Sequence, residues 1–191
     1  ARGIMPVDIV PDAVNEIVPH QVRSHWEELR QMLKQYGIRN ASLMALMPAE
    51  TSAKISGRGT TNGVEPVRGL IVSKGGKSSK GKFVVPEFEK LKDNYDLVWE
   101  WEGCSQLIKT YAILQKYVDQ AISGNTYYNK NNFPDEKIPL KLVASTIVDA
   151  YKYGLKTLYY NNNDDSVKEF NVSNEVSAAL DDDASCEACT L

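Results

Sequence analysis

Two cysteines near the end of the sequence have the spacing of a redox pair. Cys186 and Cys189 are separated by two residues, so their thiols can close a small-loop disulfide and exchange it with an external dithiol. Half of a zinc site and two inert terminal residues are the alternatives. A zinc ion takes four ligands, and the sequence adds only Cys104 and two isolated histidines. No metal site is therefore predicted.

Two adjacent phenols form a second candidate site. Tyr159 and Tyr160 close a short run, residues 155–160, whose composition is typical of a β-strand. Successive side chains of a regular strand point to opposite faces, so these two rings can stack on each other only where the backbone bends. Ordinary core aromatics at a strand end are the alternative.

A third candidate site lies at a turn that contains a proline. The apolar residues 43–47 predict a buried strand, Pro48 begins a turn, and residues 53–56 can start a helix. Unpaired N–H groups at such a helix start point the same way, and Thr51 and Ser52 add hydroxyl donors, so an anion such as a phosphate fits there. The alternative is an ordinary strand-to-helix turn capped by Thr51 or Ser52.

Other elements must position these candidates, and four stretches show apolar residues at helical spacing. The first follows a Ser-x-x-Glu capping box that begins at Ser24, and Gly37 supplies its stop. The last has Pro139 in its first turn and Gly154 at its end. We expect helices over residues 26–36, 88–101, 107–122 and 139–153.

The segments between these helices have different patterns. Residues 69–72 and 82–85 predict the two strands of a hairpin, with a polar, glycine-rich tip at residues 73–81. Residues 126–134 are polar and turn-rich. Cys104 precedes the third helix and has no cysteine neighbour, so we expect a buried, idle thiol there rather than a reactive one.

Composition limits the class of protein. The chain has 191 residues with 42% hydrophobic content, enough for one domain with a core. A net charge of −3 argues against a nucleic-acid binder, which needs excess Lys and Arg. No apolar run of about 20 residues and no signal peptide is visible, so we expect no membrane contact and a cytoplasmic protein. Three cysteines are a poor disulfide framework, which fits a reducing compartment.

The two ends of the sequence differ from its middle. Residues 1–20 contain three prolines and predict an irregular connector with at most a short helical turn and no partner in this chain. Residues 161–191 are acidic and polar, with few large apolar side chains, so we expect a mobile tail.

Motifs along the whole chain resemble those of one family, the large subunit of class I ribonucleotide reductase. The matching residues keep one register from end to end, which makes chance a poor explanation. They are Trp26, Leu29, residues 37–40, Met44-Ala45, Pro48, residues 61–69, residues 84–86, residues 119–126, residues 156–160 and the paired-cysteine tail.

This resemblance implies a fold and a domain division. The expected fold is α/β: the C-terminal part of the ten-stranded α/β barrel of ribonucleotide reductase, with outer helices and a disordered C-terminal tail. Residues 1–20 would be a connector, residues 21–160 the barrel part, and residues 161–191 the flexible acidic tail with the CxxC pair. The predicted helix at residues 139–153 would also help to form the groove for the small subunit's C-terminal peptide.

The resemblance also implies site roles in the reduction of ribonucleoside diphosphates. Tyr160 would receive a radical from the small subunit and Tyr159 would pass it on, and each oxidation of a phenol releases a proton with the electron. Cys186 and Cys189 would form a thiol shuttle that thioredoxin or glutaredoxin reduces. The residues implied to hold the substrate diphosphate are Pro48, Ala49, Glu50, Thr51 and Ser52.

The same resemblance implies that this chain does not act alone. The family's radical and metal centre is in the small subunit, so no cofactor is expected here, and the thiyl cysteine belongs to the remaining part of the large subunit. Cys104 matches none of the family's reactive cysteines. We expect the phosphate turn, the tyrosine pair and the dithiol to converge on one pocket. The rival hypothesis is a non-catalytic relic or a thiol-bearing interaction module.

Overall fold

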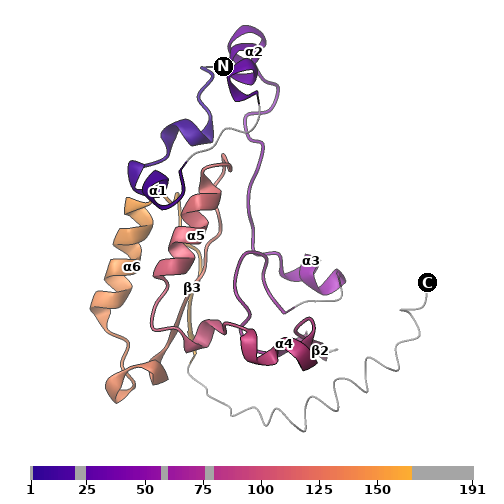
Figure 1. Cartoon of the computed structure of the whole chain (residues 1–191), viewed down its shortest axis with the longest axis vertical. Helices are drawn as coiled ribbons and strands as arrows, with labels where there is room; N and C mark the ends of the chain where they lie inside the picture. Colours follow the sequence, from indigo (N-terminus) through magenta and orange to yellow (C-terminus); the bar gives the residue numbers. More distant parts are fainter. Residues whose placement is uncertain (1, 20–24, 57–59, 76–79, 165–191) are drawn as a thin grey trace, which may run out of the picture. The chain divides into compact units, whose positions relative to one another are not determined.

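The computed structural model describes residues 2–19, 25–56, 60–75 and 80–164. These residues form two compact units: unit 1 holds residues 2–48 and 102–163, and unit 2 holds residues 49–101 (Figure 1). The elements are η1 (Pro6–Ile9), α1 (Asp12–Ile17), α2 (Trp26–Tyr36), α3 (Glu50–Ile55), β1 (Ile71–Gly75), β2 (Lys80–Val84), α4 (Phe88–Leu91), η2 (Lys92–Asn94), η3 (Val98–Glu100), α5 (Ser105–Gln115), β3 (Thr126–Asn129), η4 (Lys130–Asn132), η5 (Pro134–Glu136), α6 (Leu140–Lys152) and β4 (Asn161–Asp164).

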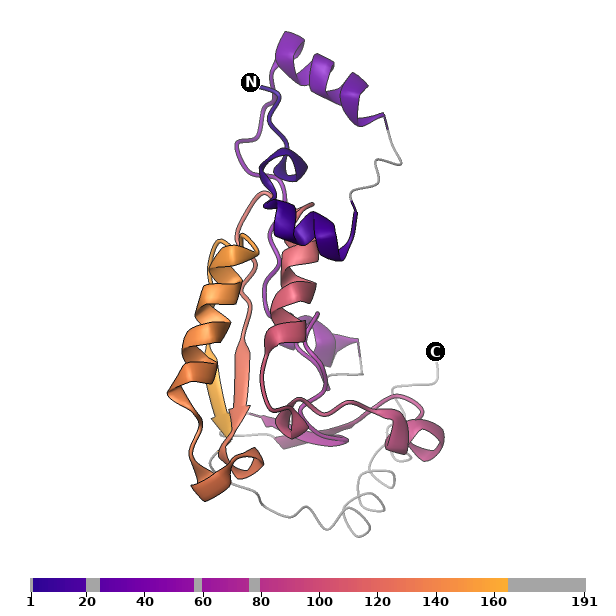
Figure 2. The ribbon, with the colours of Figure 1, turned by 60° about the vertical axis from the view of Figure 1, so that its left-hand side comes forward.

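Helix α5 is the centre of unit 1. It contacts both α6 and α1, and α6 lies beside α5 in both views of the ribbon (Figures 1 and 2). Ile108 and Tyr111 of α5 are buried, as is Val14 of α1, and the Lys116 ammonium donates to the Val18 carbonyl. The prediction of an irregular N-terminal segment without a partner is therefore wrong. Val14 gains enough burial against α5 to order the segment.

Strand β3 lies in the core of unit 1. All four of its residues are buried, and it pairs with β4. The sequence predicted a polar, turn-rich segment at residues 126–134 and a strand at residues 155–160. The first prediction is wrong for residues 126–129, which form β3 with Tyr127 and Tyr128 buried, and is confirmed for residues 130–134, which lie in the turns of η4 and η5. The second is wrong in position, because the second strand begins only at Asn161. The first residues of the predicted tail therefore belong to a sheet.

Unit 2 contains the predicted hairpin. Strands β1 and β2 are antiparallel with Ile71 opposite Val84, and both strands extend into the segment predicted as the hairpin tip. Residues 76–79 of that tip lie outside the described residues. Val67, Val85 and Phe88 form the buried cluster behind the hairpin.

The single helix predicted over residues 88–101 is wrong. The chain forms three short helical pieces, α4, η2 and η3. The break comes at Tyr95, whose backbone is extended and whose hydroxyl donates to the Pro86 carbonyl at 2.7 Å. The Val98 amide then bonds to the Val67 carbonyl at 3.0 Å. These tertiary bonds replace the bonds of a continuous helix.

Two predicted helices have the expected bounds. Helix α2 ends at Gly37, which takes φ 76°, and α6 ends before Gly154, which takes φ 74°; this left-handed backbone suits a residue without Cβ. The N-cap of α2 is His25, and Ser24 of the predicted capping box lies outside the described residues. Pro139 is the N-cap of α6 rather than a residue of its first turn.

Helix α5 is shorter than predicted. It ends at Gln115 instead of continuing to residue 122. Nε2 of the Gln115 side chain donates to the carbonyls of Val118 and Gln120, each at 2.8 Å, which holds the chain in a turn. Ile122 is then free to pair with Leu46 in a parallel bridge.

Candidate functional site

The phenol rings of Tyr159 and Tyr160 are in contact and tilted against each other. The ring centroids of Tyr159 and Tyr160 are 4.0 Å apart, with the ring planes inclined at 51°. The Tyr159 hydroxyl donates a hydrogen bond to the Tyr160 hydroxyl at 3.2 Å. Both side chains are more than half exposed, at 54% and 59%. The alternative of core aromatics is therefore wrong, because neither ring is buried in this chain.

The hydrogen bond between the two phenols affects the titration of Tyr159. The bond that the Tyr159 hydroxyl donates to Tyr160 stabilises the protonated form, so it raises the pKa of the Tyr159 phenol above its usual value. Tyr159 is therefore a neutral hydrogen-bond donor at neutral pH.

The backbone of the tyrosine pair is attached to a neighbouring segment, residues 124–126. The Tyr159 amide donates to the Gly124 carbonyl at 2.8 Å, and the Tyr160 carbonyl accepts from the Thr126 amide at 2.9 Å. The Tyr160 amide donates to Oδ1 of the Asn125 side chain at 3.0 Å. Three bonds thus fix two residues, while the rings remain accessible.

The Pro48 turn leads into α3, a helix of six residues. The Ala53 amide donates to the Ala49 carbonyl at 2.9 Å, so the helix begins one residue after Ala49. Thr51 and Ser52 then lie inside the first turn, and both are exposed. The alternative in which either residue caps the helix is wrong, because the helix begins before both of them.

Residues 43–47, which precede Pro48, are extended but not buried. Leu43 and Met47 are 62% and 64% exposed, so the predicted burial of this segment is not found within this chain. On one side the segment pairs with residues 120–123: the Gln120 amide donates to the Met44 carbonyl, and the Ser123 amide to the Leu46 carbonyl, each at 3.0 Å. Apolar side chains that suit a core are thus exposed here.

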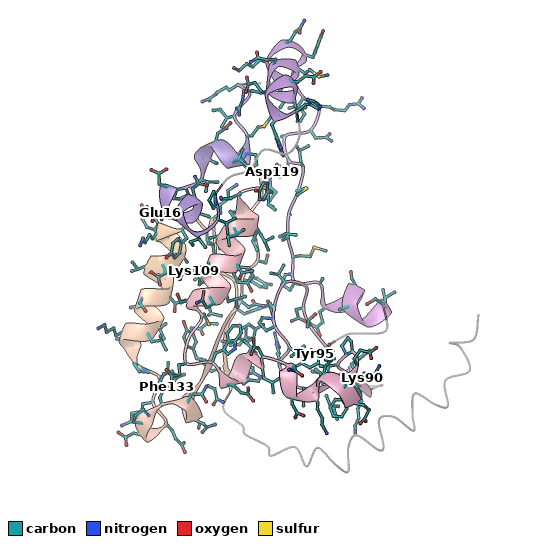
Figure 3. The ribbon with its side chains drawn as sticks, in the orientation of Figure 1. Glu16, Lys90, Tyr95, Lys109, Asp119 and Phe133 are labelled. Atoms are coloured by element: carbon teal, nitrogen blue, oxygen red, sulfur yellow. The ribbon has the colours of Figure 1, made fainter. Side chains whose placement is uncertain are left out.

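Asp119 fixes the start of this extended segment. Its carboxylate accepts the amides of Leu43 and Met44 at 2.8 and 2.7 Å, and Figure 3 labels it beside the segment that follows α2. These two bonds lower the pKa of the Asp119 carboxyl, so it is ionised at neutral pH. Its main-chain carbonyl accepts a bond from the Lys156 ammonium, three residues before Tyr159.

One stretch of chain therefore holds two segments of unit 1. Residues 119–123 hold the extended segment 43–46, and residues 124–126 hold the tyrosine pair. Residues 119–126 lie within the family resemblance, but no role was predicted for them. Their signal in the sequence is Gly124 followed by the polar pair Asn125-Thr126.

Of the three cysteines, only Cys104 lies among the residues that the structure describes. Cys104 is buried, and its Sγ lies 3.1 Å from both the amide and the carbonyl of Tyr127. Burial raises the pKa of the Cys104 thiol, which confirms the prediction of a buried thiol. Cys186 and Cys189 lie outside the described residues, so the dithiol remains a prediction.

Helix α6 presents apolar side chains on its outer face. Its inner face is buried through Thr146 and Ala150, whereas Leu140, Ile147, Val148 and Tyr151 are exposed. An open hollow of about 360 Å³ lies beside its first turn, lined by Gly103, Phe133, Pro139 and Leu142 among others. An exposed apolar row of this kind marks an interaction surface more often than a solvated one.

Two classes of feature are not found among the residues that the structure describes. No group of three or more His, Cys, Asp or Glu side chains there could hold a metal ion. None of the helices in that part of the chain has the length and apolar character needed to cross a bilayer.

Comparison with known proteins gives a consistent match. The family model described as "Ribonucleotide reductase, barrel domain" matches residues 1–161. The chain is 41% identical over its whole length to the ribonucleoside-diphosphate reductase subunit alpha of Haemophilus influenzae, of which it covers 24%. It is 39% identical to the ribonucleoside-diphosphate reductase 1 subunit alpha of Escherichia coli and 35% identical to the ribonucleoside-diphosphate reductase subunit alpha of Enterobacteria phage T4, in each case with the whole chain aligned to 25% of the relative. The chain thus spans about a quarter of the length of these relatives.

Proposed function

Because the chain belongs to the ribonucleotide reductase barrel-domain family, we propose that it supplies the C-terminal part of the large subunit of a ribonucleoside-diphosphate reductase. In this proposal it completes a ten-stranded α/β barrel together with the remaining part of that subunit. The reaction replaces the ribose 2′-OH by hydrogen through radical chemistry.

The contact between Tyr159 and Tyr160 is the observation that carries the proposal. A phenoxyl radical on Tyr160 lacks one electron and one proton. The neighbouring Tyr159 hydroxyl, 3.2 Å away and already donating toward the Tyr160 oxygen, can supply both as a hydrogen atom. The Tyr160 O–H bond forms, the Tyr159 O–H bond breaks, and the radical moves to Tyr159.

The exposure of both rings also fits this role. A relay between subunits needs one phenol at the protein surface, where a partner can reach it. Both tyrosines are more than half exposed, so Tyr160 can receive the radical from the small subunit, which houses the metal centre. In the proposed assembly the partner proteins would cover this surface and exclude water.

The Pro48 turn is proposed to hold the substrate diphosphate. Amides and hydroxyls of Thr51 and Ser52 can donate to phosphate oxygens, and a favourable contact at a helix start contributes about 0.3 to 1 kcal/mol. Ala49 has no side-chain donor, so backbone amides would serve there. Glu50 repels a phosphate, and its carboxylate is proposed to accept a bond from a neighbouring amide or from the ribose.

Two exposed surfaces support the proposed protein partners. Residues 43–47 pair on one side and expose apolar side chains, which suits a barrel strand whose other neighbours come from the remaining part of the large subunit. The outer face of α6 suits an amphipathic or extended peptide, and we propose the C-terminal peptide of the small subunit. Cys186 and Cys189 would deliver electrons from thioredoxin or glutaredoxin.

The test reconstitutes the complete enzyme. This chain is mixed with the remaining large-subunit part and the small subunit, and CDP reduction is measured with thioredoxin as reductant. We expect turnover that Tyr159→Phe or Tyr160→Phe abolishes while circular dichroism stays unchanged. Tyr36→Phe is the matched control, because Tyr36 is an exposed phenol on α2 without a proposed role, and it should keep full activity.

Two further variants separate the other roles. Cys186→Ser should allow the first turnover and stop later ones, because the shuttle acts only after the active-site disulfide has formed. Thr51→Val combined with Ser52→Ala should raise KM for CDP more than it lowers kcat. Normal turnover in either tyrosine variant would refute the relay, and a folded complex without activity would favour the non-catalytic module.

A further inference from the structure

The side chain of Asn125 occupies a special place in the backbone pairing beside the tyrosines. The Tyr159 amide donates to the Gly124 carbonyl and the Thr126 amide donates to the Tyr160 carbonyl. Both bonds advance in the same direction along the two segments, so the pairing is parallel. The arrows of β3 and β4, which continue these segments, lie side by side and point the same way (Figure 2).

This pairing contains an extra residue. In a regular parallel ladder, one residue bonds to both neighbours of the residue opposite it. Its N–H donates to the carbonyl of the preceding neighbour, and its C=O accepts from the amide of the following neighbour. Here the N–H comes from Tyr159 and the C=O from Tyr160, so two residues lie opposite Asn125. This arrangement is a β-bulge, which bends the strand and changes the direction of its side chains.

The bulge leaves the Tyr160 amide without a main-chain acceptor in the ladder. Oδ1 of Asn125 accepts this amide at 3.0 Å, and Asn125 is only 2% exposed. Because a backbone N–H can only donate, the oxygen of the Asn125 amide must be the atom that faces it. A buried side chain thus takes the place of the missing carbonyl.

From this geometry we propose that Asn125 is a positioning residue that holds the bulge and thereby places the two phenols against each other. Adjacent side chains of a regular strand point to opposite faces, yet these rings lie 4.0 Å apart. Without the Asn125 oxygen, the Tyr160 backbone amide has no acceptor. A shift of the strand into a regular register would give this amide a main-chain acceptor, so the shifted register becomes the more stable one. This shift turns one ring to the other face.

The catalytic consequence rests on the proposed radical relay, whereas the structural consequence does not. If the phenols separate, the hydrogen atom has no short path from Tyr159 to Tyr160. Substrate binding at the Pro48 turn involves neither ring. Loss of the Asn125 oxygen should therefore lower kcat at least tenfold and leave KM for the nucleoside diphosphate unchanged.

The test compares Asn125→Leu, which removes the acceptor at similar size, with Asn125→Asp, which keeps an acceptor oxygen. Nuclear Overhauser contacts between the two tyrosine rings are recorded in the full chain with labelled tyrosine. We expect Asn125→Leu to lose these contacts and to return the pKa of Tyr159 toward its usual value. Asn125→Asp should keep the ring contacts.

Asn129→Leu is the matched control. The Asn129 side chain also accepts a backbone amide, that of Asn131 at 3.0 Å, and Asn129 is also buried. Its loss should leave the ring contacts and the pKa of Tyr159 unchanged. If Asn125→Leu does not fold, Asn125→Gln, which displaces the amide by one methylene, should give the same loss of ring contacts.

The outcomes separate the two proposals. Ring contacts that persist in folded Asn125→Leu or Asn125→Gln would overturn the positioning role, whatever the activity. Lost ring contacts with normal turnover in the reconstituted enzyme would confirm that role and refute the relay. Lost contacts with a lowered kcat, an unchanged KM and recovery in Asn125→Asp would support both.

Discussion

Gly124 lies between the tyrosine pair and the core of unit 1, and adding one methyl group there tests how closely they are packed. A Cβ at this position would lie 2.9 Å from both Cδ2 and Cε2 of Tyr111, closer than carbon atoms approach in folded proteins. The Tyr111 ring is 2% exposed and cannot move into solvent. Gly124→Ala must therefore displace either this ring or the backbone whose carbonyl accepts the Tyr159 amide.

The expected cost follows from two opposing terms. Overpacking of a core costs about 1 to 3 kcal/mol. Gly124 is not among the residues with positive φ, so alanine adds no backbone strain and stabilises by about 0.4 to 1 kcal/mol through the unfolded chain. Taking central values, a cost of about 2 kcal/mol less a gain of about 0.7 kcal/mol, the net loss of unfolding free energy is about 1 to 2 kcal/mol. At about 2 to 4 °C per kcal/mol for chains of this size, Tm should fall by about 2 to 8 °C.

Thermal unfolding followed by far-ultraviolet circular dichroism measures this loss, with Gly69→Ala as the matched control. A Cβ on Gly69 meets only the Ile71 carbonyl oxygen at 3.5 Å, an ordinary contact, so Tm should stay the same or rise. The steric cause is tested by repeating Gly124→Ala in a Tyr111→Leu chain, where the destabilisation should disappear. An equal loss of Tm on both backgrounds would refute this explanation.

Three other predictions concern single groups. The pKa of the Asp119 carboxyl is lower in the folded chain than its usual value of 3.8. The carboxylate therefore stabilises the fold fully above about pH 3.8, and this stabilisation is lost as the pH falls toward the folded pKa. Asp119→Asn lacks it at every pH, so acid unfolding of this variant, followed by circular dichroism, should begin at higher pH. Cys104 should resist iodoacetamide at pH 8 until the protein is unfolded, because its thiol is buried and burial raises its pKa. The measurement uses a chain whose two tail cysteines are replaced by serine, and rapid labelling of the folded chain would contradict the prediction. Ile147→Asp or Tyr151→Glu on the exposed face of α6 should leave the free energy of unfolding within about 0.5 kcal/mol of the parent. Either change should weaken binding of the small subunit's C-terminal peptide at least tenfold, as isothermal calorimetry would show.

Helices with complete local signals could be predicted from the sequence. Helix α2 combines apolar spacing from Trp26 with a glycine stop, and α6 combines Pro139 with Gly154; both have their expected ends. In each case the start and the stop depend on residues within one turn of the helix end. The hairpin of β1 and β2 is similar, because its strands are neighbours in sequence.

Elements whose ends depend on distant residues were predicted wrongly. The apolar positions from Phe88 onward fit a helix, but the Val67 carbonyl takes the Val98 amide and the cluster around Val85 buries Phe88. Helix α5 stops at Gln115 although the apolar spacing continues, because the Gln115 side chain bonds to the carbonyls of Val118 and Gln120 and the Gln120 backbone amide bonds to the distant Met44 carbonyl. Side-chain and tertiary hydrogen bonds decide these ends, and the spacing of apolar residues does not predict such bonds.

In the candidate site, too, the hydrogen bonds between residues far apart in the sequence could not be predicted. The chemical groups, Tyr159 and Tyr160, could be predicted from the sequence. The alternation of side chains along a strand also predicted that their rings can meet only where the backbone bends. The cause of the bend is Asn125, whose oxygen bonds to an amide 35 residues further along the chain. Asp119 likewise accepts amides 75 and 76 residues away.

Both residues act through a side-chain oxygen that replaces a main-chain acceptor. Such a bond appears only when the fold brings a backbone break and a short polar side chain together, and an Asn or Asp in the sequence is more often part of a turn. The types of the reacting residues could therefore be predicted from their own chemistry. Their relative placement depends on residues that carry no chemical signal, so only the hydrogen-bond pattern of the folded chain identifies them.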